Sequence, residues 1–132
     1  MFVPSALGAT RSWIRSTSIG PMTGNRNYFE IPQQDRPELP FTVHYRYGGT
    51  VDDQWMDHPD MSFECWGENK KAAEDLAIAL VGELITLDQG RHLVIDGVRY
   101  CGATLNIGPV PNPSPSWAKV FRVDATLHMR LV

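Results

Sequence analysis

The residues best suited to chemistry gather between positions 44 and 60. This segment holds two histidines and four aspartates, namely His44, Asp52, Asp53, Asp57, His58 and Asp60. Imidazole nitrogens and carboxylate oxygens are ligands that divalent cations accept. Their spacing matches no metal-binding pattern, however, and the carboxylates are not followed by the glycine that tight oxygen-ligand loops require. We therefore expect an exposed acidic hairpin tip here, with no metal and no cofactor.

A cysteine nucleophile would need a base beside it that favours the thiolate. The chain has two cysteines, Cys65 and Cys101, and the histidines that could serve them are His44, His92 and His128. Both cysteines lie in apolar, strand-like stretches, where a buried reduced thiol is the common outcome. The glycine-bearing runs 48–49 and 102–108 also lack the Lys-Ser/Thr pair of a phosphate loop. We expect no catalytic residue, and the chain is predicted not to be an enzyme.

Large aromatic residues in two irregular segments suggest contact surfaces. Trp55 lies in the acidic stretch and Trp117 follows a run of prolines. Such residues either anchor an interface or fold back on their own core. Residues 20–40 and 48–60 contain too many prolines, glycines and acids to bury much area alone, so we expect both segments to lie outside the subunit's own core. The candidate assembly-interface residues are Tyr28, Phe29, Asp52, Asp53, Trp55, Met56, Asp57 and Trp117.

Length and composition fit one domain. A chain of 132 residues, 42% hydrophobic and 20% charged, can bury a core and is not a disordered polyelectrolyte. The longest largely apolar run, residues 76–87, is too short to cross a bilayer of about 30 Å. No signal peptide is evident. We therefore expect no membrane span and folding in a cytoplasm.

The net charge of −3 is unevenly distributed. Before Glu30 the only charged residues are Arg11, Arg15 and Arg26, whereas residues 50–68 contain six acids and neither Lys nor Arg. This asymmetry predicts two oppositely charged surfaces, although solvated loops would give the same pattern. A protein that coats nucleic acid would need a basic stripe, which the sequence lacks.

The elements that must position these residues follow from the hydrophobic period. Residues 5–16 predict a short helix, and the four prolines of 20–40 exclude a further helix and limit any strand to 28–31. Strict alternation then predicts a strand over 41–47 that ends at Gly48-Gly49, and a second over 61–66. Together these strands predict a hairpin with a long acidic tip.

The second half predicts a long helix followed by three strands. Asn69 is a plausible N-cap, and apolar residues then recur at intervals of three and four to about residue 87. An Asp-Gly turn at 96–97 joins strands 93–95 and 98–107. Prolines at every second position of 109–115 predict a stiff connector, and a final alternating strand begins at Lys119.

This order predicts an α+β fold. A mostly antiparallel sheet carries one long helix packed across one face, with a short N-terminal helix. Residues 1–132 form a single domain, of which 1–40 are an irregular N-terminal arm. The residues expected to pack the sheet against the helix are Leu76, Leu80, Leu84, Phe121, Val123 and Leu127.

A family resemblance covers about residues 39–132. It rests on Phe63-Glu64-Cys65-Trp66-Gly67, on Lys71-Ala72-Ala73-Glu74 leading into the long helix, on Asp96-Gly97-Val98, and on the Pro-rich connector before the final alternating strand. This pattern resembles the tail terminator proteins of long-tailed bacteriophages, also called tail completion or head-tail joining proteins. The N-terminal third departs from that family, which usually opens with a longer helix and a clear following strand.

The resemblance implies a structural virion protein of the phage tail, assembled in the host cytoplasm. It would form a homo-oligomeric, hexameric ring on the last ring of the tail tube, stop tube polymerisation and offer its other face to the head. Its partners would be the tail tube protein and the head connector or stopper protein. DNA would pass through the channel without specific binding, helped by the acidic loop. The alternatives are a head-side connector, stopper or minor capsid protein and, more distantly, a small metal-dependent enzyme.

Overall fold

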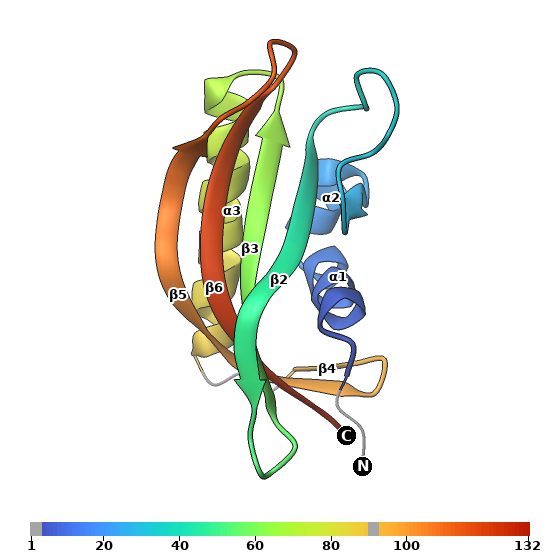
Figure 1. The fold of residues 1–132 in the computed structure, drawn as a ribbon, viewed down its shortest axis with the longest axis vertical. Coiled ribbons are helices and arrows are strands. Elements are labelled where there is room, and N and C mark those ends of the chain that lie inside the picture. The colour runs from blue at the N-terminus through green and yellow to red at the C-terminus, as the bar shows by residue number, and fades with distance from the viewer. Residues whose placement is uncertain (1–3, 90–92) are drawn as a thin grey trace.

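The computed structural model describes residues 4–89 and 93–132. They form an α+β domain in which helices cover one face of a single curved sheet (Figure 1). In chain order the elements are α1 (Ala6–Ser16), α2 (Ile19–Thr23), β1 (Asn27–Tyr28), β2 (Phe41–Val51), β3 (Asp57–Gly67), α3 (Lys70–Asp88), β4 (Leu93–Ile95), β5 (Val98–Asn112) and β6 (Lys119–Leu131). The strand order across the sheet is β1-β2-β3-β6-β5-β4. Every neighbouring pair is antiparallel except β1 with β2. The predicted fold class is therefore confirmed.

The main core lies between α3 and the centre of the sheet. Asn69 caps α3 by accepting a hydrogen bond from the Ala72 amide at 2.8 Å, as the sequence predicted. The apolar stripe of the helix then packs on Phe63 and its neighbours in β3 and β6. All six residues expected to join helix and sheet are less than 5% exposed, which confirms them: Leu76, Leu80, Leu84, Phe121, Val123 and Leu127.

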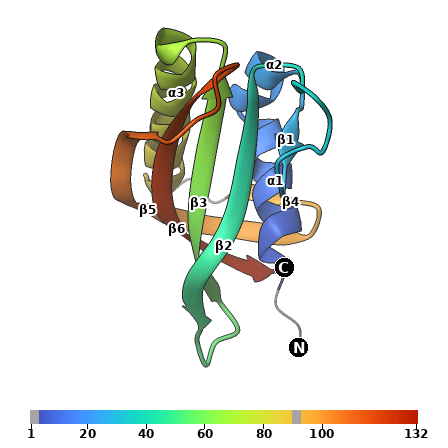
Figure 2. The ribbon, with the colours of Figure 1, turned by 45° about the horizontal axis from the view of Figure 1, so that its top comes forward.

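Residues 4–40 are more ordered than expected. Helices α1 and α2 bury Trp13, Ile14 and Ile19 in the main core, and the Trp13 ring lies edge-on to Phe63 at 6.5 Å. The prediction of an irregular arm is wrong for this part. Pro21 lies in the first turn of the five-residue α2, where its missing N–H costs no helical hydrogen bond. Figure 2 shows α1 beside β2, with α3 farther along the same layer.

Strand β2 presents its apolar residues to the face without helices. Thr42 and His44 pair with Cys65 and Phe63 and so face the helical layer. Phe41 and Val43 point the other way, into a second apolar cluster that also contains Trp66, Ala118 and Val120. Alternation had correctly predicted a strand, but it suggested only one buried face. It could not tell which side the helices cover, because both sides of β2 are buried at this end.

Three strands are longer than predicted, which shortens the loops. Strand β2 continues through Gly48-Gly49 to Val51 after a bulge, and β3 begins already at Asp57. The hairpin tip is therefore only 52–56. Strand β5 continues through Pro109 and Pro111 to residue 112, since an edge strand accommodates prolines whose nitrogen faces its open side.

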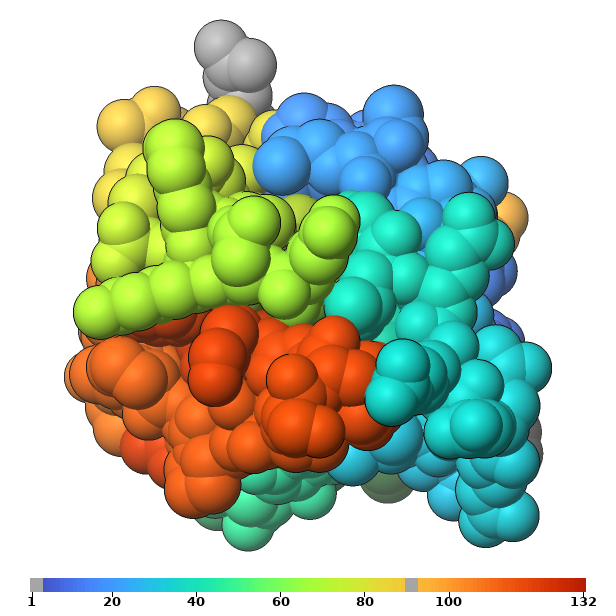
Figure 3. Space-filling view, turned by 90° about the horizontal axis from the view of Figure 1, so that it is seen from above, coloured from blue at the N-terminus to red at the C-terminus, as the bar shows by residue number. Residues whose placement is uncertain are grey.

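The sheet has two distinct ends. The β2–β3 hairpin projects beyond the body of the protein at one end, at the bottom of Figure 1. At the opposite end, Figure 3 shows the start of α3, the segment after β5 and residues 30–40 side by side. Loops far apart in the sequence thus form one surface there, and the hairpin projects from the other end.

Candidate functional site

The tip of the β2–β3 hairpin is a tightly hydrogen-bonded turn. Asp52 Oδ1 accepts from the amides of Gln54 at 2.9 Å and Met56 at 3.0 Å. The main chain closes the same turn, with the Asp52 amide donating to the Met56 carbonyl at 3.0 Å and the Trp55 amide donating to the Asp52 carbonyl at 3.2 Å. The pKa of Asp52 lies below its usual value. The largest cause is a hydrogen bond between its carboxylate and His58, and the Met56 and Gln54 amides add to it. Asp52 therefore organises the turn.

Trp55 is the side chain that this turn displays. It is 47% exposed and belongs to neither apolar cluster. Its backbone has φ 62°, a left-handed conformation that costs an L-residue roughly 1–2 kcal/mol. The neighbouring Asp53 is exposed and Met56 half-buried. An exposed indole and carboxylate on a strained but well-bonded turn are typical of a contact feature.

A chain of hydrogen bonds links this tip to the sheet. His58 Nε2 lies 3.0 Å from Asp52 Oδ2, and His58 Nδ1 lies 2.7 Å from His128 Nδ1. His128 Nε2 in turn lies 3.2 Å from Thr104 Oγ1. Burial and the nearby His58 lower the pKa of His128, while Asp88 opposes this shift. Sequence reasoning did not pair the two histidines, because 70 residues separate them and only the β3–β6 register brings them together.

Asp57 differs from the exposed tip residue that was expected. It is fully buried, and its carboxylate accepts two hydrogen bonds from the Arg46 guanidinium, at 2.8 and 2.9 Å. The bidentate pair ties the start of β3 to β2 directly below the tip. Asp57 therefore belongs to the hairpin's own structure in the isolated subunit.

The remaining aromatic candidates contact the subunit itself. Trp117 stacks on Trp66 at 5.5 Å, Trp66 on Phe41 at 5.1 Å, and Phe41 contacts Tyr28 at 5.6 Å. This ladder of four rings joins the Pro-rich segment and β1 to the helix-free face, so Trp117 and Tyr28 fold back on the second cluster. The expectation that residues 20–40 lie outside the subunit's core is wrong for this part of them.

Phe29, the last aromatic candidate, lies under α1. Its ring meets the His44 ring edge-on at 5.3 Å, and the Arg11 guanidinium carbon lies 4.1 Å from its centroid. His44 is fully buried, and its Nε2 lies 3.0 Å from the Leu7 carbonyl oxygen. Burial lowers the pKa of His44 to about 4. The ring is therefore neutral at physiological pH. It contacts Leu7 and Phe29 within the subunit and does not belong to the acidic tip.

The cysteines do not form a nucleophile with any described histidine. Cys65 is fully buried, and this burial raises the pKa of its thiol to about 12. Cys101 is half-buried, with its thiol 4.0 Å from the Arg99 carbonyl oxygen. His92 lies outside the described residues. In the described chain both thiols are free. Neither thiol has a described histidine as a hydrogen-bond partner.

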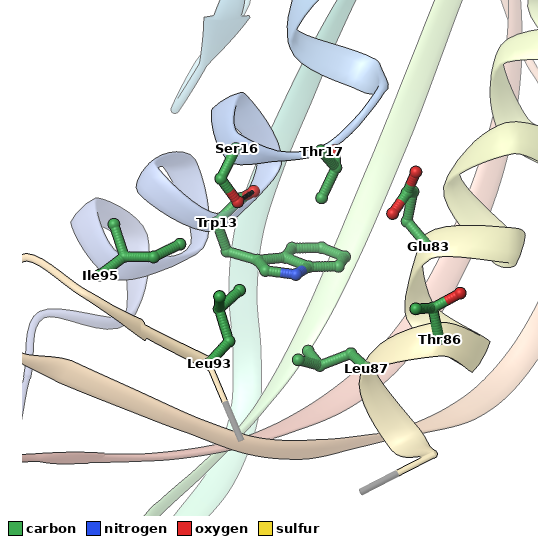
Figure 4. Close-up of a pocket in the computed structure, with 8 residues that line it drawn as sticks. All are labelled: Trp13, Ser16, Thr17, Glu83, Thr86, Leu87, Leu93 and Ile95. Carbon is green, nitrogen blue, oxygen red and sulfur yellow. Dashed lines mark hydrogen bonds between the residues drawn. The ribbon is translucent and has the colours of Figure 1, made fainter. Parts of the chain in front are cut away.

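A shallow pocket of about 420 Å³ lies between α1, α3 and β4 (Figure 4). Its floor is apolar, formed by Trp13, Leu87, Leu93 and Ile95, and hydroxyl groups lie at its rim. Among its described lining residues the one carboxylate is Glu83, which already accepts from the Ser18 hydroxyl at 2.7 Å and the Ser18 amide at 3.3 Å. The described lining therefore offers mainly apolar contact.

Two further findings concern metal binding and membrane-spanning helices. Across residues 4–89 and 93–132, no group of three or more His, Cys, Asp or Glu side chains could hold a metal ion. No helix in the described part of the chain is long and apolar enough to cross a membrane.

In comparisons with known proteins, no protein-family model matches the chain, and no curated protein matches it.

Proposed function

We propose that the chain is a bacteriophage tail terminator. It forms a homo-oligomeric ring at the head-proximal end of the tail tube, stops polymerisation of the tube and joins the tail to the head. The proposal rests on the sequence resemblance described above. It is supported by the fold, in which the strand that ends in Cys65-Trp66-Gly67 leads directly into the Ala-rich start of α3. That step is the centre of the resemblance.

The observation that carries the proposal is the built hairpin tip. A projecting turn that is bonded internally and leaves an aromatic side chain exposed suits a subunit that acts through assembly, because aromatic anchors supply much of the binding energy of interfaces. The β2–β3 tip fits this description, since Asp52 bonds it internally while Trp55 remains 47% exposed. His44, His58, His128 and Cys65, by contrast, are engaged in packing or hydrogen bonds. This distribution favours a structural role over a catalytic one.

The direct test is to add the purified protein to tail tubes from the phage that encodes it. We expect electron microscopy to show extra density at one end of each tube, and we expect capped tubes to stop growing when tube subunits are supplied. Light scattering of the protein released from those ends should give about six times the 14.8 kDa subunit mass. Tubes that elongate unchanged and uncapped would contradict the proposal.

The same assay separates the alternative on the head side. A head connector or stopper would bind isolated DNA-filled heads and leave tail tubes bare. A terminator must bind the tube first, because ending the tube is its defining act. Binding to heads alone would therefore replace the proposed function with the head-side one.

A further inference from the structure

A groove between α1 and the β4–β5 hairpin combines basic and apolar groups. Arg11 and Arg15 line it from α1, and Ile95, Val98 and Leu131 supply apolar surface. Its volume is about 420 Å³, which is enough to receive a bicyclic side chain. Figures 1 and 2 show α1 and β4 next to each other at this site.

The charge of the groove is not neutralised from within the subunit. Arg15 is exposed and donates to the Asn25 carbonyl at 2.9 Å, while the Arg11 guanidinium lies over the Phe29 ring. Among the described residues, neither arginine forms an ion pair with a carboxylate. Among the described residues that line the groove, Asp96 is the one acid beside the two arginines.

The hairpin tip has the complementary properties. It presents an exposed indole, Trp55, next to an exposed carboxylate, Asp53. Asp52 is engaged by His58 and Asp57 by Arg46, so Asp53 is the acid that the tip leaves exposed. Trp55 is not among the residues that line the groove of its own chain.

We propose that the tip of one subunit docks in the groove of a second copy of this chain. Trp55 lies against the apolar surface of the groove, and Asp53 faces Arg11 and Arg15. The inference rests on the proposed ring and specifies its subunit contact. Because tip and groove are different surfaces, the contact is heterologous, and repeating it generates a closed ring when the rotation between subunits closes.

A second copy is the occupant that the charges favour. Arg11 and Arg15 line the groove and Asp53 is exposed at the tip of the same chain, so every copy carries both halves of the contact. Opposite charges across such an interface steer association and fix its register. Tryptophan and arginine are also the residues most enriched where interface binding energy concentrates.

Charge reversal with rescue tests the contact. Asp53→Lys and Arg15→Glu should each weaken self-association at least tenfold in analytical ultracentrifugation, and the double variant should recover most of the loss. Trp55→Ala should weaken it at least tenfold. Matched controls are Glu68→Lys, an exposed acid off the tip, and Ile78→Ala, an apolar residue 55% exposed on α3. All variants should keep the wild-type melting temperature within a few degrees.

Cross-linking covers the case in which the isolated protein associates only weakly. Gln54→Cys protein mixed with Ser12→Cys protein should form an intermolecular disulfide under oxidation, whereas Gln54→Cys mixed with Glu68→Cys should not. Absence of the first cross-link in ring or tube-bound protein, or a double charge reversal no better than either single one, would overturn the docking contact.

The two proposals fail separately. A ring that forms normally with Trp55→Ala would leave the proposed function standing and remove the docking contact. Specific cross-links between copies of a protein that never caps tail tubes would keep the contact and remove the function.

Discussion

The imidazole rings of His58 and His128 face each other with their Nδ1 atoms 2.7 Å apart. The Asp52 carboxylate accepts from His58 Nε2, so in the neutral pair His128 donates to an unprotonated Nδ1 of His58. Hydrogens on both Nδ1 atoms at once would break the contact. The link between tip and sheet is therefore sensitive to acid.

We expect acidification to loosen the hairpin tip. The pKa of His128 is lowered, so an open form binds its proton more strongly, and the closed form loses stability as the pH falls below the ordinary value of about 6.5. Amide hydrogen exchange at 52–58, corrected for intrinsic rates, should be faster at pH 5 than at pH 7.5. His128→Asn should reduce this difference. Equal protection of the wild-type tip at both values would contradict the prediction.

Buried His44 should make global stability depend on pH in the same direction. Its pKa is about 4 in the folded chain, against an ordinary value of 6.5, so the unfolded state binds more protons between these values. The free energy of unfolding should therefore fall by about 3 kcal/mol as the pH drops from 6.5 to 4. Urea titrations of wild type and His44→Gln measure this, since glutamine can still donate to the Leu7 carbonyl. The variant should show a flatter profile, and two parallel profiles would rule out this role.

The two adjacent aspartates of the tip should behave differently. Asp52→Ala removes the acceptor of the Gln54 and Met56 amides, so these amides should exchange at least tenfold faster. Asp53→Ala leaves the turn's hydrogen bonds in place and should leave exchange unchanged. Mass spectrometry of the tip peptide compares the two. If Asp53→Ala loosens the turn as much as Asp52→Ala, the assignment of Asp52 as the organiser is wrong.

The main core should respond strongly to truncation on the inner face of α3. Leu80 is fully buried, whereas Ile78 is 55% exposed on the same helix. Leu80→Ala should lower the free energy of unfolding by about 2–5 kcal/mol, and Ile78→Ala by less than about 0.5 kcal/mol. Denaturant midpoints at a constant m-value report both. A cost below about 1 kcal/mol for Leu80→Ala would mean that the helix face is misassigned.

How much the sequence could predict depended on how far apart the interacting residues lie. The α3 stripe and its Asn69 cap were predictable, because every residue involved lies within one helix. The last strand was equally clear from its alternation. Which side of β2 the helices cover was not, since Phe41 and Val43 are buried by Trp66 and Val120 from other strands. Helix α2 was not predicted, because prolines usually end a helix. Pro21 lies in the first turn of α2, where a proline is tolerated.

The sequence predicted where the hairpin tip lies but not the contacts that hold it together. Acids, Trp55 and the hairpin were visible in the sequence, and the structure places Trp55 and Asp53 at the surface. Asp57 was assigned to the same exposed loop, yet it is buried against Arg46. That ion pair depends on the cross-strand register, as does the contact of His58 with His128. Local sequence patterns carry no information about either.

The prolines of β5 also bear on how copies of this chain behave when crowded. Within the described residues no strand pairs with β5 beyond Tyr100 on the side of β4, so the longest strand of the sheet has an open margin. Pro109 and Pro111 lack the amide hydrogens that an incoming strand would need. Amyloid-like stacking, which requires an unbroken ladder of main-chain donors, is blocked along this stretch. The prolines thus interrupt the ladder of donors at the 109–112 end of this margin.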